Sequence, residues 1–301
     1  MSRKLSAREE ATRGLSRFSR SEKGIVPLRA PEIVPERVLS RRRFVRRTGA
    51  ATVGLAAGWG TPTILPAAST QWGDLVGRLV YDGPAPERKR LKVDKDLECC
   101  GKFDIRDESL MVGEDGGLAN VFLYLRTRAV DVCPELEETV EKQVKLDNRD
   151  CIFMPHCMTI WYDKQEFYII NSDPVPQNVD FAPLGDLHAN IVLPVDGDAT
   201  WTFKRAQRMP VPIACNYHPW ESAYILPFAN PYVAISGPDG TFKIPKLPVG
   251  QLEFQVWHER HQQLGYLPVP QWFRGRFRVT IKPGTNYLPT FKLAPSLFER
   301  K

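Results

Sequence analysis

The stretch PIACNYHPWE, residues 212–221, decides how this 301-residue chain is interpreted. It places Cys215 at the end of a predicted strand at 211–215, three residues before His218 in the loop that follows. A sulfur and an imidazole at this spacing can either hold a metal ion or pack in a core. The rest of the chain is therefore interpreted around these two side chains.

From residue 72 onward, the chain alternates short apolar segments with turn residues. Its 26 prolines argue against a helical bundle, because proline breaks helices. The spacing predicts an all-β sandwich with one short helix at 134–142. The predicted strands cover residues 75–81, 118–125, 144–146, 159–162, 166–170, 178–181, 199–203, 211–215, 223–226, 232–235, 241–244, 253–258, 277–281 and 288–293.

The formal net charge of +6 comes from the first part of the chain. Residues 1–69 hold 14 of the 41 basic and 5 of the 35 acidic residues, so this segment carries +9 and the remainder −3. A nucleic-acid partner requires a basic folded surface. The charge distribution therefore predicts no nucleic-acid binding.

Residues 40–46, SRRRFVR, precede a weakly hydrophobic segment at 49–65. This arrangement resembles a twin-arginine export signal, with Arg41 and Arg42 as the paired arginines. The resemblance implies a signal and disordered leader over residues 1–70, the twin-arginine translocation machinery as a partner, and a periplasmic or otherwise exported location. The alternative is a basic patch before a short buried helix.

Six cysteines without any C-x-x-C pair fit an oxidising compartment better than a structural zinc site. The sequence leaves their connectivity open, and Cys100 with Cys151 is one pairing that we consider. The six are Cys99, Cys100, Cys133, Cys151, Cys157 and Cys215.

A second stretch, NSDPVPQNVDF at 171–181, ends in a predicted strand. Together with 212–221, it resembles the two copper-site segments of the cupredoxin family. Residues 223–226, 230–235 and 239–250 are similar to further motifs of a group of exported cupredoxin-like proteins. The resemblance implies a β-sandwich in which one cysteine and two histidines hold copper for one-electron transfer, with a weak axial methionine or glutamine.

Two ligand positions depart from the pattern that this resemblance implies. Gln177 stands where the first copper histidine is expected, and Glu221 stands at the axial methionine position. An amide is a poorer copper ligand than an imidazole, which weakens the site, although Glu221 can compensate as an oxygen ligand. The candidate metal set is therefore Cys215, His218, Glu221 and Gln177, with copper as the implied cofactor and His156 as a substitute ligand.

The resemblance, the leader and these departures together predict an exported cupredoxin-like protein with an incomplete copper site. Such a protein would serve as a non-catalytic binding or structural module of the cell envelope. The alternative is a periplasmic copper electron carrier that uses Cys215, His218 and Glu221 and has an envelope or redox partner. The sequence contains no nucleophile elbow, phosphate loop or dinucleotide fingerprint, so it predicts no enzyme. A further alternative is a carbohydrate-associated accessory module that binds polysaccharide through Trp161, Trp201, Trp220, Trp257 and Trp272.

The other histidines give weaker signals. His156 is predicted to be a loop residue bonded to backbone, His188 a solvated residue, and His258 a structural or surface residue. His258 and His261 lie three residues apart, so they do not form an H-E-x-x-H pattern.

Residues 232–257 resemble the latter half of a carboxypeptidase-regulatory-like, or transthyretin-like, sandwich. Residues 77–83 and 118–125 resemble its first half, and neither half has enough strands to bury a core by itself. We therefore predict a discontinuous domain, 72–130 plus 230–295, with a cupredoxin-like domain at 140–229 inserted in it or packed beside it. The alternative is three consecutive small β units. Pairing of 75–81 or 118–125 with 241–257 distinguishes the two arrangements.

Overall fold

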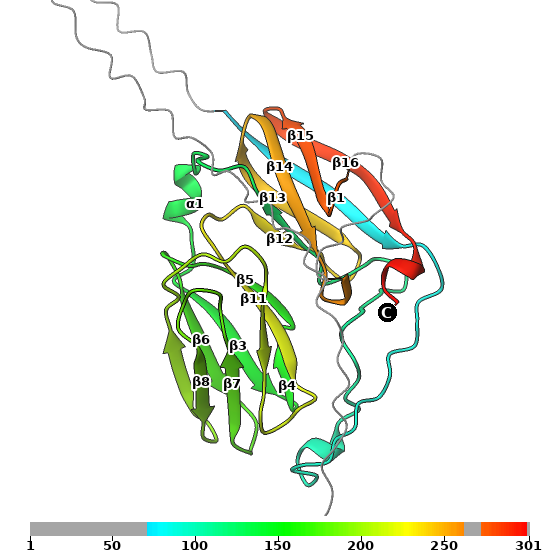
Figure 1. Cartoon of the computed structure of the whole chain (residues 1–301), viewed down its shortest axis with the longest axis vertical. Coiled ribbons are helices and arrows are strands. Elements are labelled where there is room, and N and C mark those ends of the chain that lie inside the picture. The colour runs from blue at the N-terminus through cyan, green and yellow to red at the C-terminus, as the bar shows by residue number, and fades with distance from the viewer. Residues whose placement is uncertain (1–70, 262–271, 300–301) are drawn as a thin grey trace, which may run out of the picture. The chain divides into compact units, whose positions relative to one another are not determined.

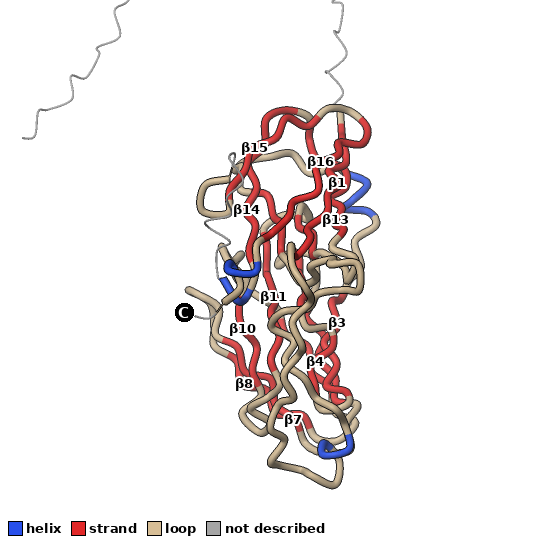
Figure 2. The backbone as a smooth tube through the Cα atoms, turned by 90° about the vertical axis from the view of Figure 1, so that its right-hand side faces the viewer, coloured by secondary structure: helices blue, strands red, loops and turns tan. Residues whose placement is uncertain are grey.

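The computed structural model describes residues 71–261 and 272–299, and these residues fold almost entirely into β-strands. Figure 2 shows how little helix accompanies the strands, and the all-β prediction is confirmed. Among the described residues, α1 (Pro134–Glu138) is the one α-helix, and none of their helices is long and apolar enough to cross a membrane. The leader with Arg41 and Arg42 lies outside the described residues.

Two sheets form the first sandwich, and they combine strands from both ends of the described chain (Figure 1). The strand orders are β13-β1-β16 and β12-β2-β14-β15. Every second residue of β1 is buried, so one face of this strand is directed at a core. The strands are β1 (Trp72–Tyr81), β2 (Phe122–Leu125), β12 (Val233–Ile235), β13 (Thr241–Pro248), β14 (Gly250–Trp257), β15 (Arg276–Ile281) and β16 (Gly284–Leu293).

Pairing within this sandwich joins segments that are far apart in the sequence. Strand β1 runs antiparallel to β13, with Leu75 opposite Ile244, and parallel to β16. Strand β2 runs antiparallel to β14, with Leu125 opposite Phe254. These are the pairings on which the prediction of a discontinuous domain, 72–130 plus 230–295, depends.

The second sandwich is built from a continuous part of the chain. Its two sheets have the strand orders β5-β11-β10-β7-β8 and β4-β3-β6-β9, and their inner faces share one apolar core that includes Phe167, Phe181 and Ile213. The strands are β3 (Gln143–Arg149), β4 (Ile152–Met154), β5 (Cys157–Trp161), β6 (Glu166–Asn171), β7 (Gln177–Phe181), β8 (Ala189–Leu193), β9 (Asp198–Trp201), β10 (Val211–Ala214) and β11 (Ser222–Phe228).

A smaller apolar cluster joins the two sandwiches. Phe122 and Trp257 of the first sandwich pack with Leu226 of the second, and the rings of Phe122 and Trp257 meet edge to face. The hydroxyl of Tyr124 donates a hydrogen bond of 2.9 Å to the backbone carbonyl of Arg208. Apolar burial and a satisfied hydroxyl therefore both hold the sandwiches together.

Two elements are four residues shorter in the structure than the sequence predicts. The strand predicted at 118–125 begins only at Phe122, because Asn120 has a positive φ of 62° and interrupts the extended chain. The helix predicted over 134–142 ends at Glu138, because Thr139 caps it and β3 starts at Gln143. Strands β4 and β8 lack a predicted counterpart altogether.

The segment between β1 and β2 leaves the first sandwich and reaches the second. Its short 3-10 helix η1 (Cys100–Lys102) carries Cys100, which forms a disulfide with Cys151 in the turn between β3 and β4. This is the pairing that the sequence left as one of several. The two cysteines are 51 residues apart, so the bond removes roughly 4 kcal/mol of chain entropy from the unfolded state in the loop-closure treatment.

Candidate metal centre

The two stretches that suggested a metal site meet at one end of the second sandwich. Strands β7 and β10 are antiparallel neighbours, with Ala214 opposite Asp180. Gln177 begins β7, and Cys215 follows the last residue of β10. The start of one strand and the end of its antiparallel neighbour lie at the same edge of a sheet. The sheet therefore brings Gln177 close to the Cys215 loop.

The four predicted side chains converge in the interior. The Sγ atom of Cys215 lies 3.8 Å from Nδ1 of His218 and 3.5 Å from Oε1 of Gln177. Nδ1 of His218 lies 2.7 Å from Oε1 of Gln177 and 3.2 Å from Oε1 of Glu221. None of the four exposes more than 3% of its surface. The structure thus places these four candidate ligands in one buried group.

Backbone contacts set the shape of the Cys215 loop. The side-chain oxygen of Asn178 accepts hydrogen bonds from the backbone N–H groups of Asn216 and Tyr217, at 2.7 and 3.2 Å. The backbone N–H of His218 points at Sγ of Cys215, 3.3 Å away. Such a contact stabilises negative charge on the sulfur. The loop therefore presents the sulfur of Cys215 and the imidazole of His218 towards each other.

Two acidic residues that the sequence did not single out complete the surroundings. Nε2 of Gln177 donates to Oδ2 of Asp173 at 2.9 Å, and Nε2 of His218 contacts Oδ2 of Asp96 at 2.8 Å. Asp173 lies in the quoted stretch 171–181, so its position four residues before Gln177 was a usable signal. Asp96 is 122 residues from His218, and no local pattern connects them.

The surroundings strongly perturb the ionisable groups. Burial lowers the pKa of His218, but hydrogen bonds with Cys215, Glu221 and Asp96 outweigh it and raise that pKa to about 10. Burial raises the pKa of Glu221, and the contact with His218 offsets part of this effect. The Oε2 atom of Glu221 is buried and has no hydrogen-bond partner among the described residues. A buried carboxylate oxygen in that condition is costly unless a cation or proton satisfies it.

The donor set fits a single metal ion of mixed ligation. Ligand atoms of Cys215, His218 and Glu221 all lie within 4.8 Å of one another. Donors bound to one tetrahedral or trigonal ion stand roughly 3.3–3.8 Å apart, and two of the measured separations here are 3.2 and 3.8 Å. The set does not fit the trigonal copper site with two imidazoles, because Gln177 fills the second position and accepts a hydrogen bond from His218.

The remaining histidines lie elsewhere. Nδ1 of His156 donates to the backbone carbonyl of Ser222 at 3.0 Å, as predicted for a loop residue bonded to backbone, and its Nε2 contacts Glu259 at 2.6 Å. It therefore does not substitute for the missing ligand. His188 is exposed and bonded to Asp180. His258 is buried with its ring against Phe298, and the side chain of His261 lies outside the described residues.

The tryptophans that suggested a sugar-binding face are largely internal. Trp161, Trp220, Trp257 and Trp272 are buried, and Trp201 is half-buried. A stacking platform for polysaccharide requires exposed rings. Polysaccharide binding therefore stays a prediction that these residues do not support.

No protein-family model and no curated protein matches the chain. Among solved structures, a mutant of amicyanin in its Cu(I) form is 14% identical, with a TM-score of 0.24, and the match covers 35% of this chain and 96% of that one. A purple cupredoxin from Nitrosopumilus maritimus is 16% identical, with a TM-score of 0.23, covering 29% and 98%. The Cu-containing nitrite reductase from Thermus scotoductus SA-01 is 14% identical, with a TM-score of 0.27, covering 33% and 27%. Such a likeness concerns the fold alone.

Proposed function

We propose that the second sandwich is a non-catalytic metal-binding module, which holds one metal ion through Cys215, His218 and Glu221. The observation that carries the proposal is the convergence of three buried donors of the types that bind transition metals, with the Oε2 atom of Glu221 left without a partner among the described residues. Gln177 lies beside the donors and positions His218 through its hydrogen bond.

The charges around the donors favour a cation. Glu221 and Asp173 are both buried, and Asp96 contacts the far side of the His218 ring. Burial raises the pKa of Asp173 as well as that of Glu221, which shows that negative charge is costly at this position. His218 is the basic side chain that Glu221 and Asp96 share. A bound divalent ion offsets the excess of buried negative charge.

Copper is the ion that the sequence resemblance implies, and when bound it supplies one-electron chemistry. Electron transfer to a partner protein normally requires a ligand edge near the surface. The ring of His218 has no exposed surface, and the carboxylate of Asp96 covers its Nε2 atom. This arrangement supports a binding or structural role over that of an electron carrier.

A metal-free structural cluster is the second candidate, and the contacts of Gln177 favour it. Its oxygen accepts from His218, while its nitrogen donates to Asp173 and, at 3.2 Å, to Glu221. These bonds satisfy most of the buried polar atoms without any ion.

Titration with copper(II) and with zinc(II) separates the two candidates. The purified chain is expected to bind one equivalent by elemental analysis after desalting, with a thiolate-to-copper absorption band. Both signals should be lost in Cys215→Ser and kept in Cys133→Ser, whose buried thiol lies outside the second sandwich. Unchanged stoichiometry in Cys215→Ser, or no binding by the parent chain, would leave the hydrogen-bonded cluster as the function of the site.

We also propose that the protein is exported by the twin-arginine pathway into the periplasm. The paired Arg41 and Arg42 support this, and the Cys100–Cys151 disulfide suits an oxidising compartment. Replacing both arginines with lysine should leave the protein in the cytoplasmic fraction. Undiminished export of the double variant would refute the assignment.

A further inference from the structure

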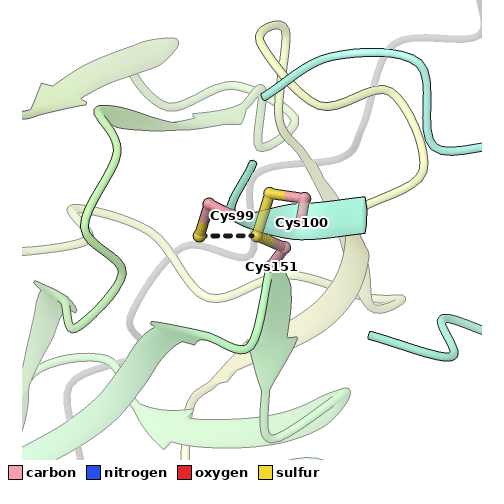
Figure 3. Close-up of side chains that lie close together, drawn as sticks. All are labelled: Cys99, Cys100 and Cys151. Atoms are coloured by element: carbon pink, nitrogen blue, oxygen red, sulfur yellow. Dashed lines mark hydrogen bonds between the residues drawn. A yellow bond between two sulfur atoms is a disulfide. The ribbon is translucent and has the colours of Figure 1, made fainter. Parts of the chain in front are cut away.

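Three cysteines of the described chain form a second cluster, separate from Cys215. Cys100 and Cys151 form the disulfide, and Sγ of Cys99 lies 3.8 Å from Sγ of Cys151 (Figure 3). Figure 3 shows the free thiol directed at the sulfur of Cys151. Two sulfurs at this separation are almost in van der Waals contact, so a small displacement brings Cys99 within reach of the disulfide.

The three sulfurs differ in their access to solvent. Cys100 and Cys151 are completely buried, whereas Cys99 is half-buried. Cys99 also lines an open hollow between its own segment, with Leu97 and Lys102, and the segment before β7, with Pro174 and Val175. A small thiol in solution can therefore approach Cys99 but not the two sulfurs of the existing disulfide.

We propose that Cys99, Cys100 and Cys151 form a thiol–disulfide exchange centre, in which Cys99 gives low-molecular-weight thiols access to the buried disulfide. This proposal does not depend on metal binding at Cys215. It assigns a use to a thiol that the candidate metal centre does not require.

The internal step conserves both atoms and electrons. Cys99 loses its proton, and its thiolate attacks Sγ of Cys151. The Cys99–Cys151 bond forms while the Cys100–Cys151 bond breaks, and Cys100 leaves as a thiolate that takes up a proton. One disulfide and one thiol are present before and after the step, so no oxidant or reductant is needed.

Reduction by an external thiol then proceeds at the accessible sulfur. A small thiolate attacks Sγ of Cys99, which forms a mixed disulfide and releases Cys151 as a thiol. A second small thiol attacks the mixed disulfide, frees Cys99 and leaves as the oxidised small disulfide. Two external thiols are oxidised for the one protein disulfide that is reduced.

The charges around Cys99 determine how fast the first step is. Burial raises the pKa of the Cys99 thiol, and the nearby carboxylates of Asp173 and Asp96 act in the same direction, whereas Lys102 and His218 oppose them. The thiolate is therefore scarce near neutral pH, which keeps the disulfide stable there. Exchange should accelerate as the pH rises.

Reduction kinetics of the native full chain test the proposal. With dithiothreitol at mildly alkaline pH, loss of the Cys100–Cys151 disulfide is followed by alkylation and peptide mass spectrometry. Cys99→Ser should slow this loss about tenfold or more, because the accessible sulfur is gone. Cys133→Ser and Cys157→Ser serve as controls, since each removes a buried free thiol away from the cluster. Both should react like the parent chain.

A second variant makes the test independent of rates and of stability. In Cys100→Ser, purified under oxidising conditions, Cys99 should pair with Cys151, and mapping should recover a disulfide-linked peptide that contains both residues. The proposal is wrong if Cys151 remains a free thiol in that variant. Equal reduction rates for Cys99→Ser and the parent chain would also reject it.

Discussion

Two buried histidines, His156 and His218, occupy similar surroundings and yet differ in the groups that their ring nitrogens contact. Neither is more than 8% exposed, and each contacts at least one carboxylate. Burial lowers the pKa of His156, but the hydrogen bond and charge of Glu259, with a contribution from Glu108, outweigh it and raise that pKa. The pKa of His218 is raised for comparable reasons.

The difference lies in what faces Nδ1. In His156 this atom is committed to the backbone carbonyl of Ser222, and Nε2 is committed to Glu259 of the first sandwich. In His218 the same atom faces three side-chain groups, which are Sγ of Cys215, Oε1 of Gln177 and Oε1 of Glu221. Both Nδ1 atoms can donate to a carbonyl oxygen, but Nδ1 of His218 also has a thiol at 3.8 Å and a carboxylate at 3.2 Å, groups that can join it around an ion. Burial and a shifted pKa alone therefore do not distinguish a metal ligand from a structural hydrogen-bonded pair. The structural pair here is His156–Glu259, which we call the latch.

Removal of the latch at His156 should have the largest effect. Glu259→Ala leaves the buried imidazole without its close partner, so the free energy of unfolding should fall by about 3 kcal/mol. Both side chains are less than a tenth exposed, so solvent screens the pair weakly. Urea denaturation measures the change, and a loss below about 0.5 kcal/mol would contradict a latch role. Metal stoichiometry should stay the same.

Replacing each of the two histidines by glutamine gives the next largest effect. His218→Gln should weaken metal binding about 100-fold, or roughly 2.8 kcal/mol, because the nitrogen donor is lost. The matched variant His156→Gln should leave the affinity within about twofold. Competition with a chelator of known affinity measures both. Equal losses in the two variants would show that the site does not use Nδ1 of His218.

Adding an imidazole at position 177 should sharpen the contrast further. Gln177→His supplies the nitrogen donor that the trigonal copper arrangement lacks, and copper affinity should rise about tenfold. The thiolate-to-copper band should also intensify. Gln143→His, at an exposed position of the same sandwich, controls for a surface histidine. A spectrum that does not differ from that of the parent chain would argue against ligation at position 177.

The smallest effect is a pH dependence of the latch. Because the folded-state pKa of His156 is raised, its stabilising contribution is complete below the unfolded value near 6.5 and is lost as the pH rises through the folded value. The stability difference between the parent chain and His156→Gln should therefore shrink from mildly acidic to alkaline pH. The rise in pH removes only the charge of His156, and the neutral imidazole keeps its hydrogen bonds, so the loss of stability is small. A difference that grows with pH would contradict this account.

Local patterns were sufficient for most of the strands and for the four candidate donors. Alternation of apolar residues between turns predicted most strands of both sandwiches, and the two quoted stretches contained Gln177, Cys215, His218 and Glu221. Two strands escaped prediction: β4 has only three residues, and β8 buries only its first and last residues, so it lacks the alternation that marks a strand. The interruption at Asn120 also escaped, although asparagine is one of the residue types that adopt a positive φ most readily.

By itself, the sequence determined the all-β class, the residue types of the candidate site and their attachment to two strand ends. Short-range periodicity and composition contain that information, since they act between neighbours in the chain. Only the tertiary structure decided that Asp96 contacts His218, that Glu259 locks His156, and that Cys99 lies beside the Cys100–Cys151 disulfide. Partner choice in these cases depends on how distant segments pack, and packing is a property of the folded chain as a whole.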